Sequence, residues 1–286
     1  MNRSFRSVPY ILMVVVMAVP LAGFTSIQSL FAPKSELWER WTAHDAASTE
    51  TIDHAKWDAF LATYLEEDAK GLNRIAYARV SDADKAALRA YIDSLAAVEI
   101  SGYARPEQYA YWTNLYNALT VQVILDHYPV ASIQDIDISP GFLSNGPWGA
   151  ELVTVEGEEL TLNDIEHRIL RPIWRDPRLH YAVNCAAVGC PNLAGKAYTG
   201  ATMDAMLEDA ARAYVNDPRG VQIGTDGLVI SSIYIWFQDD FGGDDAGVIS
   251  HLKKYAEPSL AQKLDAAKEI DGHAYDWSLN ALGGAS

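Results

Sequence analysis

The chain contains only two cysteines, Cys185 and Cys190, and neither lies near its amino-terminal end. A lipid anchor on an amino-terminal cysteine is therefore excluded. Any thiol chemistry is confined to the short segment that holds this pair, and the same segment also carries His180. A cysteine becomes a strong nucleophile or a metal ligand when a nearby imidazole lowers its pKa below about 8.5.

Basic residues are few: 22 Lys and Arg stand against 38 Asp and Glu, which gives a net charge of −16. A surface this acidic repels phosphate backbones, whereas nonspecific nucleic-acid binding depends on clustered Lys and Arg. We therefore expect no nucleic acid among the partners. We interpret the acidity as a source of solubility outside the cell, in preference to an acidic functional surface.

The sequence also lacks internal repeats and low-complexity stretches. Its 286 residues, 49% hydrophobic and 21% charged, are typical of a folded chain that can bury a full core. We predict an export signal or anchor at residues 1–30, a helical prefix at residues 31–104 that packs on the core, and a core domain at residues 105–286.

One long apolar run is present at residues 8–24, behind Arg3 and Arg6. Positive charge followed by an apolar stretch is typical of an export signal. No clear cleavage site follows the run, so a membrane anchor formed by residues 8–24 stays open beside a cleaved signal. We expect an exported protein, periplasmic or extracellular, that meets a membrane only through this segment. Loss of the two arginines would bring the net charge to about −18.

Amphipathic patterns predict three helices within residues 35–98 and a strongly apolar central helix over residues 107–127. Asn114 and Asn117 interrupt the apolar face of the central helix. A buried carboxamide must find hydrogen-bond partners. Asn117 therefore either ties a loop to the helix or serves a site, as an amide that orients a base or binds an oxyanion.

Turn-forming residues separate the shorter elements that follow. We predict a hairpin within residues 151–160, a short helix over 164–170, a buried strand over 179–185, a helix over 202–215 and a hairpin that turns at 224–227. Glu166 and His167 are neighbours on the short helix. Because adjacent helical residues point about 100° apart, we expect Glu166 to face the centre and His167 to point elsewhere.

Cysteine catalysis requires a thiol, an imidazole within hydrogen-bond reach and a third group that orients the imidazole. Gly189 and Pro191 break the predicted strand at Cys190, so we expect this sulfur to be displayed in a loop and not packed. His180 lies one strand length before it, and strand alternation places Cys185 on the face opposite His180. Cys190 is therefore the predicted nucleophile.

His180 is the predicted base, with His167 as the alternative, and either Glu166 or Asp240 could accept the imidazole N–H. Three amides are predicted to contact the substrate: Asn117, Asn114 and Asn184.

Two other interpretations of the cysteines stay open. A separation of five positions at a turn allows a Cys185–Cys190 disulfide, which an oxidising compartment favours. A zinc set of the two cysteines with His180 and His167 is looser than paired Cys-x-x-Cys units, so we expect neither a metal nor a cofactor. The remaining histidines have no companion motif and are predicted to be surface or capping residues: His44, His54, His127, His251 and His273.

Four ordered blocks of the sequence resemble the successive signatures of the family of unknown function numbered 547: residues 111–120, 162–171, 180–191 and 232–241. The resemblance extends over about residues 105–245 and implies no settled activity. It implies a papain-like or transglutaminase-like core, possibly rearranged, with a cysteine, a histidine and a glutamate close together. These correspond here to Cys190, His180 and Glu166. The predicted fold class is α+β, with such a core and an amino-terminal helical prefix.

The leading hypothesis is an exported thiol-dependent enzyme, a cysteine peptidase-like hydrolase or an acyltransferase, that hydrolyses or transfers an amide or a thioester. Its substrate would be a small peptide or a thiol-containing molecule. The alternative is a noncatalytic binding or assembly module outside the cytoplasm, in which a Cys185–Cys190 disulfide fastens the loop. A Cys190 thiol with a pKa well below about 8.5 would favour catalysis.

Overall fold

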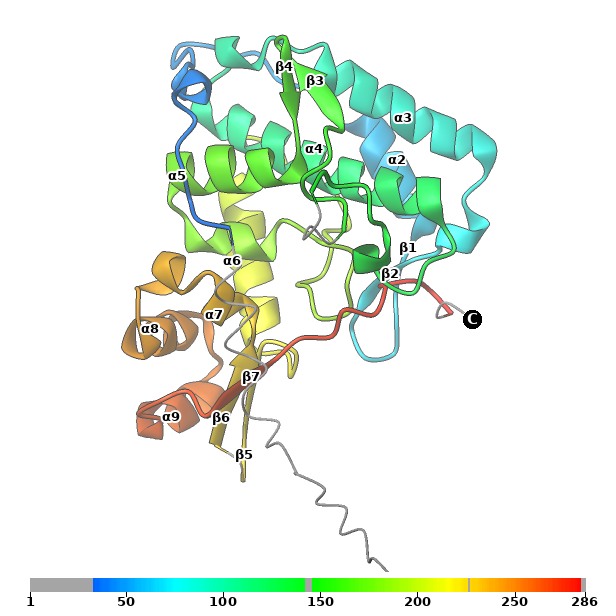
Figure 1. Cartoon of the computed structure of the whole chain (residues 1–286). Helices are drawn as coiled ribbons and strands as arrows, with labels where there is room; N and C mark the ends of the chain where they lie inside the picture. The colour runs from blue at the N-terminus through cyan, green and yellow to red at the C-terminus, as the bar shows by residue number, and fades with distance from the viewer. Residues whose placement is uncertain (1–32, 142–145, 226, 284–286) are drawn as a thin grey trace, which may run out of the picture.

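The computed structural model describes residues 33–141, 146–225 and 227–283, and it combines helices with three small sheets (Figure 1). The α-helices are α2 (Ala55–Tyr64), α3 (Asp82–Ala96), α4 (Arg105–His127), α5 (Arg171–Trp174), α6 (Met203–Val215), α7 (Ile233–Trp236), α8 (Asp245–Tyr255) and α9 (Pro258–Ala266). A π-helix, Asp164–Leu170, runs directly into α5. The 3₁₀ helices are Glu39–Thr42, Tyr77–Arg79, Ile100–Gly102, Ile133–Asp135, Pro177–Tyr181 and Gln238–Phe241.

The strands pair in three separate sheets. Two are antiparallel hairpins, β1 (Leu65–Glu67) with β2 (Asn73–Ile75) and β3 (Val153–Val155) with β4 (Glu158–Leu160). In the third, β5 (Val221–Gly224) pairs with β6 (Gly227–Ser231), and β7 (Gly272–Ala274) adds in parallel to β6. The hairpins predicted within residues 151–160 and at residues 224–227 are confirmed, whereas β7 was not predicted.

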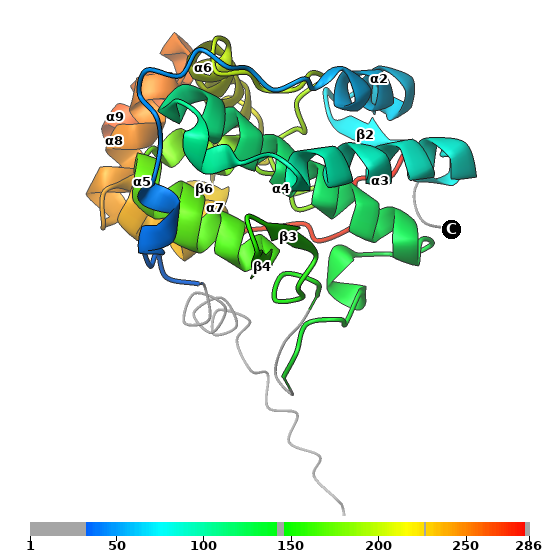
Figure 2. The ribbon, with the colours of Figure 1, turned by 90° about the horizontal axis from the view of Figure 1, so that it is seen from above.

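The central helix α4 is buried along nearly its whole length, because apolar side chains surround it instead of forming one stripe. The helix predicted at residues 107–127 is thereby confirmed. α3, the π-helix and α6 pack against it, and Figure 2 shows α3 and α4 side by side. α2 and α3 share one hydrophobic cluster with α4, so the amino-terminal helices contribute to the same core as the central helix.

A second hydrophobic cluster lies in the lower half of Figure 1, among β5, β6, α7 and α8. α6 joins the two clusters, because Met203 and Leu207 belong to the first and Tyr214 to the second. The 3₁₀ helix Pro177–Tyr181 also joins the two clusters, because Leu179 belongs to the first and Tyr181 to the second. His180, which lies between these two residues, is therefore held at the junction of the two clusters.

The segment after β7, residues 275–282, crosses from the second cluster back to the first and is drawn in red in Figure 1. It binds the cysteine loop through its main chain: Val188 N–H donates to the Ser278 carbonyl and Gly189 N–H to the Asp276 carbonyl, each at 2.8 Å. A Cβ atom on Gly189 would lie 2.7 Å from the Asp276 nitrogen. Glycine at position 189 therefore lets the two main chains approach this closely.

Two predictions of secondary structure are wrong. Residues 179–185 form no strand: Pro177 opens a 3₁₀ helix, and Asp176 caps it by accepting the Arg178 N–H at 3.0 Å. Proline suits the first turn of a helix, and the Asp cap satisfies a free N–H there, so local signals overrode the apolar strand pattern. The first of the three helices predicted within residues 35–98 is only the single 3₁₀ turn Glu39–Thr42.

Within the described ranges, we find no helix both long and apolar enough to cross a membrane. The export signal or anchor expected at residues 1–30, including the run at 8–24, lies outside the described residues.

Candidate functional site

The π-helix places Glu166, His167 and, just beyond it, Arg171 on the inside of the molecule. Its first turn is capped by Thr161, whose hydroxyl accepts the Asp164 N–H at 3.0 Å. The Arg171 N–H donates to the Glu166 carbonyl, a bond of i to i+5 that defines a π turn. Such turns recur at functional sites.

The expectation that His167 points away from Glu166 is wrong. Both side chains are buried, and Nδ1 of His167 lies 3.9 Å from Oε1 of Glu166. The helix is covered on more than one side, by α4 and by Phe237, whose ring centroid lies 5.7 Å from that of His167. Two neighbouring residues on such a helix can therefore both face protein.

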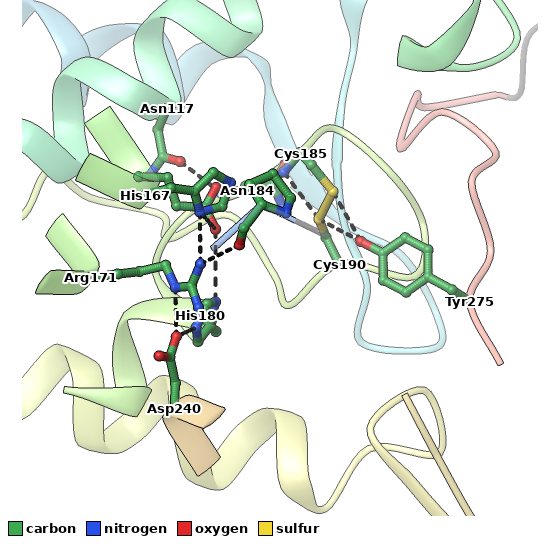
Figure 3. Close-up of polar contacts among 11 residues, drawn as sticks. Asn117, His167, Arg171, His180, Asn184, Cys185, Cys190, Asp240 and Tyr275 are labelled. Carbon is green, nitrogen blue, oxygen red and sulfur yellow. Dashed lines mark hydrogen bonds and ion pairs between the residues drawn. A yellow bond between two sulfur atoms is a disulfide. The ribbon is translucent and has the colours of Figure 1, made fainter. Parts of the chain in front are cut away.

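His180 is fixed by Asp240, which the 3₁₀ helix Gln238–Phe241 supplies. Nε2 of His180 donates to Oδ2 of Asp240 at 2.7 Å, and Nε of Arg171 donates to the same oxygen at 2.6 Å (Figure 3). The Phe237 ring stacks on the imidazole of His180 with centroids 4.3 Å apart. The ring of His180 is therefore held by one hydrogen bond and one stacking contact.

Burial acts to raise the pKa of Asp240, but the hydrogen bonds and positive charge of His180 and Arg171 outweigh it and lower this pKa to about 2. Asp240 therefore stays ionised at neutral pH. Arg171 is 4% exposed, and its guanidinium also donates to the Pro33 carbonyl at 2.8 Å. We call Glu166, His167, Arg171, His180 and Asp240 the His180 cluster.

Glu166 lies close to His180 but does not bind it as Asp240 does. Its Oε1 is 3.8 Å from Nδ1 of His180, which is longer than a hydrogen bond. Burial first, and then the negative charge of Glu166, raise the pKa of Tyr116 well above its usual value. Of the two carboxylates considered as the orienting group, Asp240 makes the hydrogen bond to the imidazole.

His167 is a neutral imidazole in the folded protein. Burial lowers its pKa to about 4. The negative charge of Glu166 acts to raise this pKa, but the positive charge of Arg171 opposes it. NH1 of Arg171 donates to Nδ1 of His167 at 3.1 Å, which requires a lone pair on that nitrogen.

The buried state of His167 predicts a pH-dependent stability. Its folded pKa of about 4 lies below the 6.5 of a free histidine, so the unfolded chain binds more protons between these values and stability falls as pH drops from 6.5 to 4. His251, whose pKa burial also lowers to about 4, acts in the same window. We expect His167→Gln to flatten the free energy of unfolding against pH in this range, measured by urea titration. The same change at exposed His44 is the control, and an unchanged slope in His167→Gln would contradict the assignment.

The amide of Asn117 ties the cysteine segment to α4. Its Nδ2 donates to the Ala182 carbonyl at 2.9 Å, and its Oδ1 accepts the Asn184 N–H at 2.8 Å. The sequence allowed two roles for Asn117, to tie a loop to the helix or to serve the site, and these bonds are those of the first role. The segment between His180 and the cysteine loop is thereby held in place.

The other two amides predicted to contact substrate are also occupied by the protein. Asn184 closes the base of the cysteine loop by donating to the Pro191 carbonyl at 2.8 Å and accepting the Ala186 N–H at 2.8 Å. Asn114 donates to the Tyr198 carbonyl at 2.8 Å and to Nε2 of His54 at 3.2 Å. Contact of these amides with a substrate stays a prediction.

The two cysteines form a disulfide, with Cα atoms 6.4 Å apart. The Tyr275 hydroxyl lies 2.9 Å from the Cys185 sulfur and 3.0 Å from the Cys190 sulfur (Figure 3). The expectation that Cys190 is displayed is wrong, because this residue is only 3% exposed. The sequence could not indicate this cover, since residues 275–282 come from far along the chain.

The predicted pairing of Cys190 with His180 is not formed in this oxidised state. The Cys190 sulfur instead accepts hydrogen bonds from the Cys185 N–H and the Tyr275 hydroxyl. No group of three or more His, Cys, Asp or Glu side chains that could hold a metal ion occurs in the described part of the chain. The disulfide also occupies both sulfurs of the alternative zinc set.

Three histidines predicted to lie at the surface or in caps are wholly or partly buried: His54, His251 and His273, which lies in β7. His54 occupies the N-cap position of α2, but it is 4% exposed and its Nδ1 lies 2.6 Å from the Tyr91 hydroxyl. His251 is partly buried, and its Nε2 lies 2.7 Å from the Tyr181 hydroxyl. His251 lies among the rings of Tyr181, Phe241 and Tyr255, a position that no local sequence pattern indicates.

Two residues of the site were not predicted. Arg171 follows His167 by four positions, a spacing that places both on one face of a helix, so a signal was present. Tyr275 had no such signal, because 85 positions separate it from Cys190.

Comparison with known proteins identifies one family. The model of the family described as "Protein of unknown function, DUF547" matches residues 100–215 of the chain. The match includes Glu166, His180 and both cysteines, but it ends before Asp240 and Tyr275. No curated protein matches the chain, and no solved structure matches it. The papain-like or transglutaminase-like fold stays a prediction.

Proposed function

We propose that this protein is a thiol-dependent enzyme that hydrolyses or transfers an amide or a thioester through Cys190, once the disulfide is opened. The observation that carries this proposal is the His180 cluster, whose His180 lies on the segment that leads directly into the cysteine loop. Burying two histidines, an arginine and the Glu166 carboxylate, and partly burying Asp240, costs desolvation energy. Groups with shifted pKa values, as His167 and Asp240 have here, concentrate at functional sites.

The geometry suggests a role for each group. Asp240 holds Nε2 of His180, so Nδ1 is the nitrogen left to accept the thiol proton, and Glu166 at 3.8 Å stabilises the imidazolium that results. The Cys185 N–H and the Tyr275 hydroxyl, each 3.0 Å from the Cys190 sulfur, favour a thiolate there. The proposal requires this sulfur to reach His180 after its release from Cys185.

The reaction then follows the usual course of cysteine catalysis. The Cys190 thiolate attacks the carbonyl carbon, and the departing amine or thiol takes the proton from the His180 imidazolium. Water hydrolyses the resulting thioester, or an acceptor amine takes the acyl group. We propose a small peptide or a thiol-containing molecule as substrate.

We also propose that the protein works outside the cytoplasm, in the periplasm or the extracellular space. The charged-then-apolar order of residues 1–30 supports export. A disulfide persists in such an oxidising compartment and is rare in the cytosol.

The proposal is tested by acylation of single-cysteine variants with a chromogenic thioester. Cys185→Ser leaves Cys190 free without any reduction step, and we expect a burst of released thiol and an acyl adduct on Cys190. His180→Ala in the same background should slow acylation by about 100-fold or more, as loss of a general base does. Cys190→Ser, which keeps Cys185, is the matched control and should show no burst. Equal acylation of the two single-cysteine variants would refute the proposal.

A noncatalytic binding or assembly module is the second candidate, and the disulfide itself favours it. A cross-linked, buried cysteine has no free thiol to act as a nucleophile, and a bridge that fastens a loop is a common structural device. If the protein is such a module, the rate at which iodoacetamide labels Cys190 of the Cys185→Ser variant should follow a thiol pKa at or above about 8.5. A pKa well below that value would argue for catalysis instead.

A further inference from the structure

The two residues that the disulfide joins differ in exposure. Cys190 is 3% exposed, whereas Cys185 is only partly buried. Thiol–disulfide exchange begins when an external thiolate attacks one sulfur in line with the bond, and access decides which sulfur is attacked. Cys185 is therefore the sulfur open to attack, and Cys190 is the one that would leave.

The surroundings of Cys190 suit a leaving thiolate. Its sulfur accepts the Cys185 N–H at 3.0 Å. The Tyr275 hydroxyl lies 3.0 Å from the Cys190 sulfur and 2.9 Å from the Cys185 sulfur, so it can donate to whichever sulfur becomes the thiolate. The Arg219 guanidinium donates to the Cys190 carbonyl at 3.0 Å, which brings a positive charge to the same loop, although Asp217 partly balances it. Hydrogen-bond donors and positive charge lower the pKa of a thiol, and a leaving thiol of lower pKa departs faster.

The loop that the disulfide closes is also held by bonds that do not involve sulfur. Asn184 donates to the Pro191 carbonyl across the base of the loop at 2.8 Å. The main chain of residues 276–280 binds it from outside, with the Asn280 N–H donating to the Ala186 carbonyl at 2.9 Å in addition to the bonds of Val188 and Gly189. These contacts would keep the loop folded after the disulfide opens.

We propose that Cys185–Cys190 is a redox-active disulfide that exchanges with the dithiol of a partner, by attack on Cys185 with Cys190 as the leaving thiolate. One thiolate of the partner bonds to the Cys185 sulfur while the bond to Cys190 breaks, and Cys190 leaves with the electron pair and takes a proton. The second partner thiolate then attacks the mixed disulfide. The partner is oxidised to its disulfide, and Cys185 and Cys190 are reduced to thiols.

This activity goes beyond acyl chemistry and does not depend on it. If the protein is also the proposed acyl enzyme, the same exchange would activate it, because only the reduced form has a free Cys190 thiol. The partner is identified here by its chemistry alone, a pair of neighbouring thiols.

The test uses the full, oxidised chain without denaturant. Glutathione is added, the reaction is stopped with acid and N-ethylmaleimide, and mass spectrometry locates each modification. We expect glutathione on Cys185 and maleimide on Cys190. Glutathione mainly on Cys190, or a disulfide that opens only in denaturant, would overturn the proposal.

A second measurement tests the hydroxyl donor. Reduction by dithiothreitol should be about three- to tenfold slower in Tyr275→Phe than in the wild type, because the departing thiolate loses a donor. Tyr111→Phe, which removes a buried hydroxyl bonded to the Leu95 carbonyl, is the matched control and should reduce at the wild-type rate. A Tyr275→Phe disulfide reduced as fast as the wild type would contradict the proposal.

The outcomes of this test and of the acylation test are separable. Exchange at Cys185 without acylation of the Cys185→Ser variant would leave the redox proposal standing and remove the enzyme. Acylation of that variant, together with a wild-type disulfide that dithiothreitol does not reduce, would support the enzyme and remove the redox proposal.

Discussion

Replacing Asp240 by alanine is expected to lower the free energy of unfolding by about 3 kcal/mol, because it leaves the buried Arg171 charge without its carboxylate. His180 would also lose the hydrogen bond at 2.7 Å that fixes its ring. The effect lies at the low end for a broken buried ion pair because the Asp240 side chain is 22% exposed. Urea unfolding followed by circular dichroism measures the change.

Two companion variants separate charge from packing at this site. Asp240→Asn keeps the shape and an acceptor oxygen, so it should cost less than the alanine variant. Removal of both charges, in Arg171→Met with Asp240→Leu, should recover much of the loss, since a buried pair often contributes little net stability over apolar residues of similar size. A double variant less stable than Asp240→Ala would show that the pair is not the cause.

Replacing Asn117 by alanine is expected to cost a similar amount, about 3 kcal/mol. The change leaves the Ala182 carbonyl and the Asn184 N–H without their partners inside a buried segment. Each unsatisfied buried group costs about 1–3 kcal/mol. The loss should also loosen the cysteine loop, and hydrogen exchange at the amides of residues 182–184 should rise in step with the fall in stability.

Thr120→Val is the matched control on the same helix. Thr120 is equally buried, but its hydroxyl donates to the Tyr116 carbonyl, which α4 already engages. Its loss should cost about 1 kcal/mol or less. Equal destabilisation by the two variants would mean that Asn117 contributes only to packing within α4.

Local patterns predicted the elements that local forces determine. α4 follows from a long apolar sequence behind a proline, and the hairpin β3–β4 from a turn at Glu156 and Gly157, where positive φ angles of 48° and 85° form the tight reversal. The strand predicted at residues 179–185 failed because its apolar pattern fits any buried segment, whether extended or helical.

The candidate site was predictable only in part. His180, Glu166 and Asp240 were singled out by residue type and position, and the structure brings the three together. The state of the cysteines could not be predicted, because a spacing of five allows a disulfide without requiring one. Tyr275 and the burial of Cys190 depend on contacts across 85 positions, which leave no trace in local sequence.

The crossing of residues 275–282 over the cysteine loop sets an order of events during biosynthesis. The loop is made about 90 residues before the segment that covers it, an interval of roughly 5–20 s at ordinary rates of translation. Throughout that interval both thiols lack the Tyr275 hydroxyl and its neighbours. An oxidant that reaches the chain in this interval can therefore join the cysteines before the covering segment arrives.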